Sequence, residues 1–448
     1  MSHPAEPTSP AIPFSQGQTP AARAHARDGS PRVTLLTYGT RGDVEPFLAL
    51  AVRLRQAGLR VRLAAPESFH GMIGPYDLEF HGLPGDPQAL ARGLLDRAGS
   101  NVPRMVGVMT RHIQQIALEA MRVIEAACRG ADCIVHSFLM TASGHLQASA
   151  NRIPEVSAQL FPVFSPTAAF PGPTFPDLPL GPLYRRGTHA LNALIYWQGS
   201  RLLYGWVRRQ RRGLPALPAY PFSRHVRSPV PILYGFSSAV IPRPVDWGPW
   251  SVITGYWFLD PLPSWAPPED VVRFLEDGEP PVYMGFGSMI GREWESLARQ
   301  SVAALEEAGL RGLLATGSHS AFKVDLPPNI LAVGDIPHAW LFPRVEAVVH
   351  HGGAGTMAAA LRAGKPSLVL PLTADQAFWA RCVQRLGAGP PPMRKHRLLH
   401  DLSAGLHLVR EDPSIGRRAR EIGEGIARED GAGRAVEEIL RLLDVHRA

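Results

Sequence analysis

Two histidines and three glycines stand together in the stretch HHGGAGT, residues 350–356. The apolar run VEAVVHH, residues 345–351, predicts a buried strand, and TMAAALRAG, residues 356–364, predicts a helix that ends at a glycine. The turn between them would direct free backbone N–H groups and the positive end of the helix dipole at a ligand above it. This junction therefore predicts an anion-binding site.

Each position of the turn has a use in anion binding. Gly352, Gly353 and Gly355 let the backbone approach a ligand closely, while Thr356 adds a hydroxyl and His351 adds a ring donor. The turn matches neither the GxxxxGK[ST] loop nor GxGxxG. We interpret it as a phosphate cradle, and a tight turn capped by the threonine is the alternative.

A carboxylate lies in a second chemically promising turn, GTRGDVEP, residues 39–46. Asp43 follows the first predicted strand and directly precedes a helix, and in parallel α/β sheets such a turn faces the ligand crevice. A carboxylate there can take a proton from a substrate hydroxyl, or it can simply cap the helix. The residues alone leave both roles open. Arg41 fits either a place near phosphates or a solvent-facing position.

The elements that must position these turns alternate along the chain. RVTLLTYG (32–39) and RVRLAAP (60–66) predict strands on either side of a helix at 45–58, which makes a parallel βαβ unit. Further strands are expected at 133–138, 154–160, 281–288, 311–317, 329–335, 345–351 and 366–372, with a helix at 293–309.

Pro and Trp interrupt this alternation at IPRPVDWGPW, residues 241–250. The two α/β series on either side predict an α/β protein of two facing Rossmann-like domains with a ligand site in the cleft between them. The expected parts are a disordered tail (1–30), a first domain (31–240), a linker (241–252), a second domain (253–426) and a C-terminal helix (427–448) that returns to the first domain.

A long loop follows one strand of the first domain. Residues 161–182 contain seven prolines and four phenylalanines, which is incompatible with a helix or a central strand. Proline holds such a loop extended at low entropic cost. We expect Phe161, Phe164 and Phe170 to line an apolar mouth beside Asp43, and packing into the domain core is the alternative.

The next segment, residues 188–215, has an apolar face and the basic end RRQRR at 208–212. It fits a helix packed on its domain, and it also fits a peripheral membrane contact. No apolar run reaches the ~18 residues that span a bilayer. The first 30 residues lack the apolar centre of a signal peptide.

Composition restricts the classes of partner. The net charge is +7, and the basic residues are nearly all Arg because Lys occurs only at 323, 365 and 395. Codon bias in a GC-rich genome is the favoured explanation, and an anionic ligand or membrane surface is the alternative. Only one basic block occurs, so no nucleic acid partner is expected. Cys128, Cys133 and Cys382 show no metal-ligand or disulfide spacing. We expect a cytoplasmic protein.

The two turns belong to longer motifs. HHGGAGT followed by GKPSLVLPLTADQAFWARCVQRLGAGPPP resembles the donor-site signature of the family 1 inverting glycosyltransferases of GT-B fold, in the branch of sterol glucosyltransferases and bacterial natural-product enzymes. TYGTRGDVEPFLALAVRLRQAG resembles the first loop and helix of that family, and PVPILYGFSSAVIPRPVDWGPWSVITGYWFLD its interdomain segment. The resemblance covers nearly the whole chain after the tail. This chain departs from the family in DQAFW for DQPFW and in Met357 for a second threonine.

The resemblance implies a role for single residues. Asp43 would be the general base, Ile336 would offer backbone hydrogen bonds to the nucleotide base, and Trp340 would pack on it. Asp375 and Gln376 would bond the sugar hydroxyls. The full donor-binding set is Arg41, Gly287, Ser288, Ile336, Trp340, His351, Gly353, Ala354, Gly355, Thr356, Asp375 and Gln376, and the acceptor-binding set is Phe161, Phe164 and Phe170.

The resemblance implies an acceptor-binding first domain and a nucleotide-sugar-binding second domain. The expected reaction is inverting transfer of a hexose, glucose from UDP-glucose above all, to a hydroxyl of a lipophilic acceptor such as a sterol or polyketide. UDP and dTDP both remain open as the nucleotide. No metal or other cofactor is expected, because the sequence has no D-x-D pair. A nucleotide-sugar epimerase and a non-catalytic nucleotide-sugar or lipid-binding protein are the alternatives.

Overall fold

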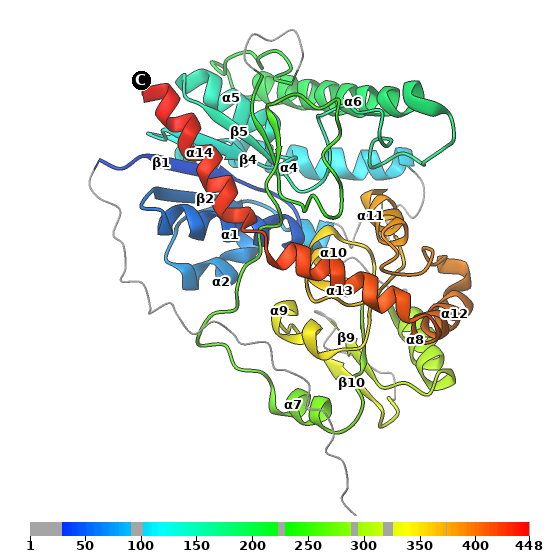
Figure 1. The fold of residues 1–448 in the computed structure, drawn as a ribbon. Helices are drawn as coiled ribbons and strands as arrows, with labels where there is room; N and C mark the ends of the chain where they lie inside the picture. The colour runs from blue at the N-terminus through cyan, green and yellow to red at the C-terminus, as the bar shows by residue number, and fades with distance from the viewer. Residues whose placement is uncertain are drawn as a thin grey trace, which may run out of the picture.

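Two parallel β-sheets, each covered by helices, make up the computed structural model (Figure 1). It describes residues 29–90, 102–222, 229–287, 294–316, 326–372 and 374–447. The first sheet has seven strands in the order β3-β2-β1-β4-β5-β6-β7, and the second has five in the order β10-β9-β8-β11-β12. The predicted α/β class with two Rossmann-like domains is confirmed.

The first sheet is built around β1, which pairs in parallel with β2 and with β4. Its central strands are buried on both faces, as expected for a sheet between two layers of helices. Its strands are β1 (Arg32–Leu36), β2 (Arg60–Pro66), β3 (Glu79–Leu83), β4 (Cys133–His136), β5 (Glu155–Gln159), β6 (Ile232–Tyr234) and β7 (Ser251–Ile253).

Helices of the first domain connect these strands. The sequence analysis predicted α1 and the long α6, and it did not predict α4 or α5. The helical elements are α1 (Arg41–Gln56), η1 (Glu67–Phe69), α2 (His70–Ile73), η2 (Gly74–Tyr76), α4 (Val102–Cys128), α5 (Thr141–Asn151) and α6 (Gly181–Gln210).

The second sheet repeats the alternation on a smaller scale, with β8 paired to both β9 and β11. Its strands are β8 (Val282–Gly285), β9 (Gly312–Ala315), β10 (Ile330–Val333), β11 (Val348–His350) and β12 (Ser367–Val369). Its helical elements are α7 (Glu269–Glu276), α8 (Trp294–Glu307), α9 (His338–Leu341), η3 (Phe342–Arg344), α10 (Ala354–Arg362), α11 (Ala374–Arg385), η4 (Lys395–Arg397) and α12 (Leu398–Glu411).

The expected linker at 241–252 overlaps a strand of the first sheet. β7 pairs with β6, so the connection to the second sheet begins after Ile253. β7 has only three residues and is flanked by sequence rich in proline and tryptophan, so its apolar pattern was too short to predict a strand.

The last two helices lie on different domains. α13 (Pro413–Ala427) packs on α10, and α14 (Gly431–Arg447) packs on α1, so together they run across both domains (Figure 1). The two chain crossings touch, because a Cβ on Gly431 would lie 2.4 Å from the carbonyl carbon of Gly255. Ser237 Oγ donates a 2.7 Å hydrogen bond to Glu429 Oε1 beside this contact.

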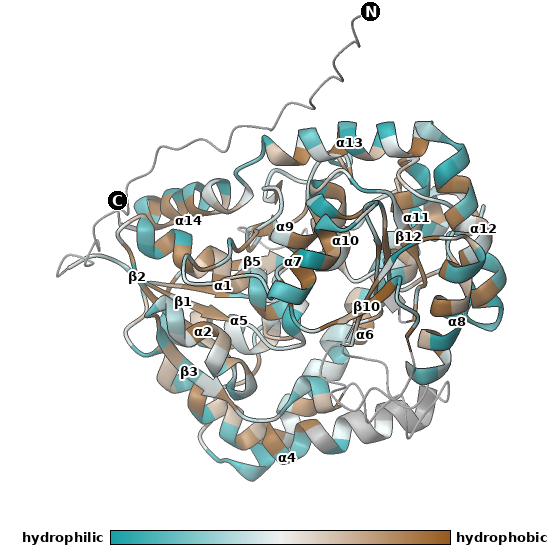
Figure 2. Cartoon of the chain, turned by 90° about the horizontal axis from the view of Figure 1, so that it is seen from below, coloured by the Kyte–Doolittle hydropathy of each residue, from teal (hydrophilic) through white to brown (hydrophobic). Residues whose placement is uncertain are grey.

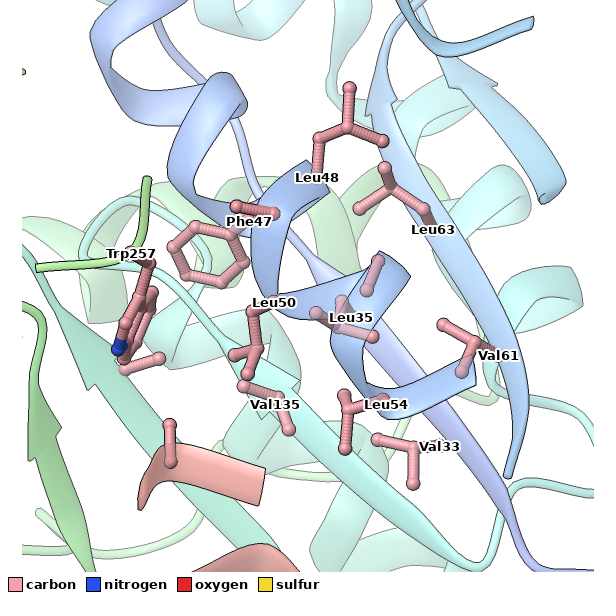
Figure 3. Close-up of a cluster of buried hydrophobic side chains, with 14 of the residues drawn as sticks. Val33, Leu35, Phe47, Leu48, Leu50, Leu54, Val61, Leu63, Val135 and Trp257 are labelled. Carbon is pink, nitrogen blue, oxygen red and sulfur yellow. The ribbon is translucent and has the colours of Figure 1, made fainter. Parts of the chain in front are cut away.

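The hydrophobic core beneath α1 fixes the position of this helix, which carries Asp43. Phe47 and Leu54 of α1 are buried against β-strand residues such as Leu35 and Leu63 (Figure 3). Phe47 meets the ring of Trp257 edge-on, with 6.0 Å between centroids. Trp257 lies in the connection to the second sheet, so this connection is anchored in the core of the first domain.

Helices with one apolar face cover the sheets, and hydrophobic and hydrophilic residues alternate along α13 and α14 in Figure 2. In the described part of the chain, no helix has both the length and the apolar content needed to cross a membrane.

Candidate functional site

The first turns of two helices meet where the domains face each other. α1 follows β1, α10 follows β11, and the two helices are in contact. Arg41 at the start of α1 lies with its Nη1 3.1 Å from Oδ2 of Asp335, which follows β10 in the second domain. Because ligands of parallel α/β sheets bind beyond the carboxyl ends of the strands, both domains present their ligand-binding edges to the same space.

Asp43 is the third residue of α1, and its carboxylate caps that helix. Its Oδ2 accepts hydrogen bonds from the Thr40 N–H at 2.8 Å and from the Thr40 hydroxyl at 3.1 Å. Gly39 has a φ of +145°, and a Cβ there would lie 2.3 Å from the same oxygen. No described residue donates a hydrogen bond to Oδ1. The cap therefore fixes the orientation of the carboxylate and leaves Oδ1 without a hydrogen-bond donor among the described residues.

Burial raises the pKa of Asp43 to about 6. The hydrogen bonds from Thr40 act in the opposite direction, and the charge of Asp375 in the second domain raises the pKa further. A carboxyl with a pKa near 6 is ionised at neutral pH and is still basic enough to take a proton from a hydroxyl. The effect of Asp375 also shows that the carboxylates of the two domains lie within electrostatic range.

The glycine–histidine turn leads from β11 into α10, as predicted. Gly352 has a φ of +87°, which favours glycine, and its N–H donates to His350 Nδ1 at 3.0 Å. A Cβ on Gly353 would lie 2.5 Å from His351 Nε2, and a Cβ on Gly287 would lie 2.8 Å from its Cε1. Glycines on both sides therefore make room for the His351 ring.

The start of α10 has no side-chain cap. Its N-cap residue is Gly353, and no side chain in the described structure accepts a hydrogen bond from the first turn at that position. Ala354, Gly355 and Thr356 form that first turn, so their N–H groups have no acceptor within the helix. This end of the helix can bind an anion.

The imidazoles around this turn are neutral at pH 7. Burial lowers the pKa of His351 to about 4, and a backbone contact with Gly285 opposes that shift. Burial and the neighbouring His351 lower the pKa of His350 to about 3. The buried Nδ1 of His351 has no hydrogen-bond partner in the described structure. His351 can thus offer a ring donor without carrying a charge.

Asp375 and Gln376 lie in the first turn of α11, beside the glycine–histidine turn. A Cβ on Gly352 would lie 3.1 Å from the carbonyl oxygen of Gln376. Gln376 Oε1 accepts a hydrogen bond from the Leu372 N–H at 2.8 Å. Burial raises the pKa of Asp375, and a hydrogen bond with its own backbone opposes the shift. The two predicted sugar-binding residues are therefore adjacent to the predicted phosphate cradle.

The predicted nucleotide-base segment lies after β10. Ile336 is buried, whereas Trp340 is partly accessible and meets Trp265 at 5.5 Å between ring centroids. The Arg344 guanidinium lies 4.5 Å above the Trp340 ring. The segment is tied to the first domain through Asp335, whose partner Arg41 also bonds Glu45 at 2.7 Å. Arg41 is thus an interdomain ion-pair residue in this structure.

Two of the three phenylalanines of the predicted acceptor mouth are buried, contrary to expectation. Phe164 and Phe170 are only 5% and 6% exposed. Phe164 stacks on Phe222 at 4.5 Å between centroids, and Phe170 packs edge-on against Phe378 at 5.5 Å. The expectation that these two rings are exposed is therefore wrong. Rings distant in sequence cover one another and are removed from water. Phe161 remains partly accessible.

Sequence reasoning missed two aromatic residues at this site. His338 stacks on Phe342 at 4.2 Å, and the Tyr283 ring lies 5.8 Å from it. Burial, with the charges of Arg41 and His351, lowers the pKa of His338 to about 3. His338 lies two residues after Ile336 in the segment DIPHAWLF, residues 335–342, and this proximity in sequence was the available signal. Ser288 lies outside the described residues.

In the described residues, no group of three or more His, Cys, Asp or Glu side chains is arranged to hold a metal ion. The groups that could meet a diphosphate here are the α10 amino end, with its partial positive charge, and the neutral ring donor of His351.

Two family models match the chain. Residues 33–164 match the glycosyltransferase family 28 N-terminal domain, and residues 314–441 match the C-terminal domain of erythromycin biosynthesis protein CIII-like proteins. The first match includes Asp43, and the second includes the glycine–histidine turn.

Two curated proteins show extended similarity. The chain is 37% identical over 424 residues to O-mycaminosyltylonolide 6-deoxyallosyltransferase of Streptomyces fradiae, and the match covers 90% of this chain and 96% of that protein. It is 32% identical over 480 residues to the sterol 3-beta-glucosyltransferase of Cryptococcus neoformans, and the match covers 99% of this chain. The chain spans only 29% of the length of that fungal protein.

Solved structures share the fold. The glycotransferase of kitacinnamycin superposes with a TM-score of 0.69 at 18% identity, over 92% of this chain and 99% of that one. The calicheamicin glycosyltransferase gives 0.65 at 18% identity, over 93% and 99%. The spinosyn rhamnosyltransferase complexed with thymidine diphosphate gives 0.58 at 20% identity, over 92% and 100%.

Proposed function

Because this chain belongs to the family 1 glycosyltransferases, we propose that it transfers a hexose from a nucleotide sugar to a hydroxyl of a lipophilic acceptor, with inversion. The observation that carries the proposal is that α1, the helix that bears Asp43 in the first domain, contacts the uncapped α10 of the second. One side of the site supplies a base, and the other supplies a place for an anionic leaving group.

Asp43 is the proposed general base. The acceptor oxygen attacks the anomeric carbon while its proton passes to the carboxylate, and the bond from that carbon to the diphosphate oxygen breaks. Thr40 holds Oδ2, so the free Oδ1 is the atom proposed to receive the proton. Attack from the side opposite the leaving group inverts the anomeric centre.

The donor is proposed to bind over α10. The first N–H groups of α10 and the neutral ring of His351 would stabilise the charge of the departing diphosphate, without a metal ion. Asp375 and Gln376, beside that turn, are proposed to bond the sugar hydroxyls. Ile336 and Trp340 are proposed to hold the nucleotide base.

The sugar and nucleotide follow from two relatives. The fungal relative is named a glucosyltransferase, which favours glucose, and UDP-glucose is the donor we propose. The spinosyn enzyme was solved with thymidine diphosphate, so dTDP-glucose is the second donor to test. The acceptor class, sterol or macrolide-like polyketide, follows from the named substrates of the two curated relatives. Cys128, Cys133 and Cys382 are unpaired, which fits the cytoplasmic location that we propose.

The test is a transfer assay in which mass spectrometry detects the product. Purified protein is incubated with UDP-glucose or dTDP-glucose and with sterols, macrolactones, simple sugars or no acceptor. We expect a mass gain of one hexose on a sterol or macrolactone, and NMR of the product should show the inverted anomer. Donor epimerised without transfer, or hexose added only to simple sugars, would contradict the proposal.

A further inference from the structure

The outer face of α6 carries apolar side chains that nothing in the described structure covers. Leu183 is 87% exposed and Leu202 is 76% exposed, and three further residues between them are exposed too. The 3.6-residue period places all five within about 120° of the helix circumference. This apolar stripe consists of Leu183, Leu191, Leu194, Ile195 and Leu202.

Exposed large apolar side chains are concentrated on and near α6. Among the described residues twelve large apolar side chains are exposed, and seven of them belong to α6 or to the loop leading into it. Single exposed leucines need no explanation, but a contiguous stripe marks an interaction surface. Figure 1 shows α6 along the outer edge of the first domain, where a flat partner could reach it.

Arginines predominate along α6 and its flanks, and the acidic residues Asp177, Asp246 and Glu125 pair three of them. Residues 178–245 contain ten arginines and no Asp or Glu. Arg201 and Arg209 on α6 and Arg212 just after it are exposed, and they form no ion pair with any described residue. Leucines flanked by unpaired arginines complement a surface with an apolar interior and anionic headgroups.

The inner face of α6 is firmly anchored, so the stripe is not a helix face waiting to fold inward. Tyr196 donates a 2.7 Å hydrogen bond to the carbonyl oxygen of Phe138, and its ring lies 5.2 Å from that of Phe164. Trp197 and Tyr204 are buried on the same side. The helix therefore links the aromatic cluster of the first domain to the outer surface.

We propose that α6 docks this protein on an anionic lipid bilayer, with the apolar stripe in the headgroup–acyl boundary and the arginines among the headgroups. The helix lies in the plane of the surface and does not cross it. Where the acceptor is lipophilic, as in the proposed function, docking places its reservoir next to the first domain.

The test uses the full chain and vesicles of phosphatidylcholine and phosphatidylglycerol in equal parts, separated by sedimentation. Wild type should bind these vesicles, and should bind pure phosphatidylcholine less. Leu191→Gln, Leu194→Gln and Leu202→Gln together should lower the partition coefficient roughly tenfold or more. The matched control changes Leu399, Leu408 and Val445, exposed apolar residues elsewhere, to Gln and should bind as wild type.

A charge series completes the test. Arg201→Gln, Arg209→Gln and Arg212→Gln together should weaken binding and reduce its salt dependence, whereas the same change at Arg417, Arg428 and Arg441 should do less. Equal binding by the leucine and control variants overturns the proposal. A wild type that binds no vesicles also overturns it. If that wild type is a dimer and the leucine triple variant is a monomer, the stripe contacts a second copy of the chain. If it is a monomer, the stripe contacts a protein partner.

Failure of the proposed function would look different. Vesicle binding requires no sugar transfer, so Asp43→Asn should bind vesicles as wild type does. If transfer is found, the leucine triple should lose activity on a vesicle-embedded sterol and retain it on the same sterol carried by cyclodextrin.

Discussion

The turn at residues 350–356 and the loop at residues 161–180 both lead from a parallel strand into a helix, but they treat their polar groups in opposite ways. The turn leaves His351 Nδ1 buried without a described partner and starts α10 without a cap. The polar groups of the loop are paired with a neighbouring segment: Asp246 accepts from the Thr167 hydroxyl at 2.7 Å and from the Ala168 N–H at 2.9 Å.

Unpaired buried polar atoms cost free energy unless a ligand completes them. The turn therefore has hydrogen-bonding capacity to offer a ligand, whereas the loop has already used its capacity to hold its own shape. We infer that binding energy is concentrated on the donor side, and that the aromatic loop contributes a rigid form. Four predictions test this difference, in order of expected effect.

Asp43→Asn should have the largest effect on activity. It removes the proposed base but keeps an oxygen that can accept from Thr40, so turnover should fall roughly 10²–10⁴-fold while nucleotide affinity is unchanged. Single-turnover transfer and calorimetric titration with UDP measure the two quantities. A correctly folded variant with wild-type turnover would rule out the assignment.

Phe164→Ala should act on stability. The ring is packed on Phe222 inside the core, so the free energy of unfolding should fall by about 3–5 kcal/mol. Phe175→Ala, at a partly accessible ring of the same loop, is the matched control and should cost less. Denaturant unfolding compares them. An unchanged stability together with a raised acceptor KM would restore Phe164 as an open acceptor residue.

His351→Ala should weaken UDP binding by roughly 10–100-fold, the usual value of a hydrogen bond to a charged group. His407→Ala, at an exposed histidine on α12, is the control and should leave affinity unchanged. Unchanged affinity for both would mean that α10 binds the anion through its backbone alone.

Asp43 should also make stability depend on pH. Its pKa is raised from 3.8 to about 6 on folding, so its contribution to stability is fully present below 3.8 and is lost as pH rises through 6. Asp43→Asn should therefore raise the melting temperature at pH 7 more than at pH 4. Buried histidines such as His351 act in the opposite direction, and they cancel in the difference between variant and wild type. A difference that does not vary with pH would show that the carboxyl is not perturbed.

The glycine–histidine turn could be predicted because its signal is local: an apolar strand, glycines and a helix in sequence. Other parts had no such signal. β3 reads EFHGL and has no apolar run, and β6 and β7 have three residues each. The burial of Phe164 depends on Phe222, 58 positions later in the sequence, and the approach of Asp43 to Asp375 depends on how two domains meet. Such contacts are tertiary, and no periodicity records them.

The contact between Gly255 and Gly431 has a mechanical consequence. The chain passes between the domains twice, once after β7 and once between α13 and α14, and the two passages touch at these glycines. Rotation about a line through that point lengthens neither passage, whereas sliding or separation strains both. The geometry thus favours rotation of the two domains about this contact over sliding or separation, and Asp43 and Asp375 belong to the two parts that such a rotation would move.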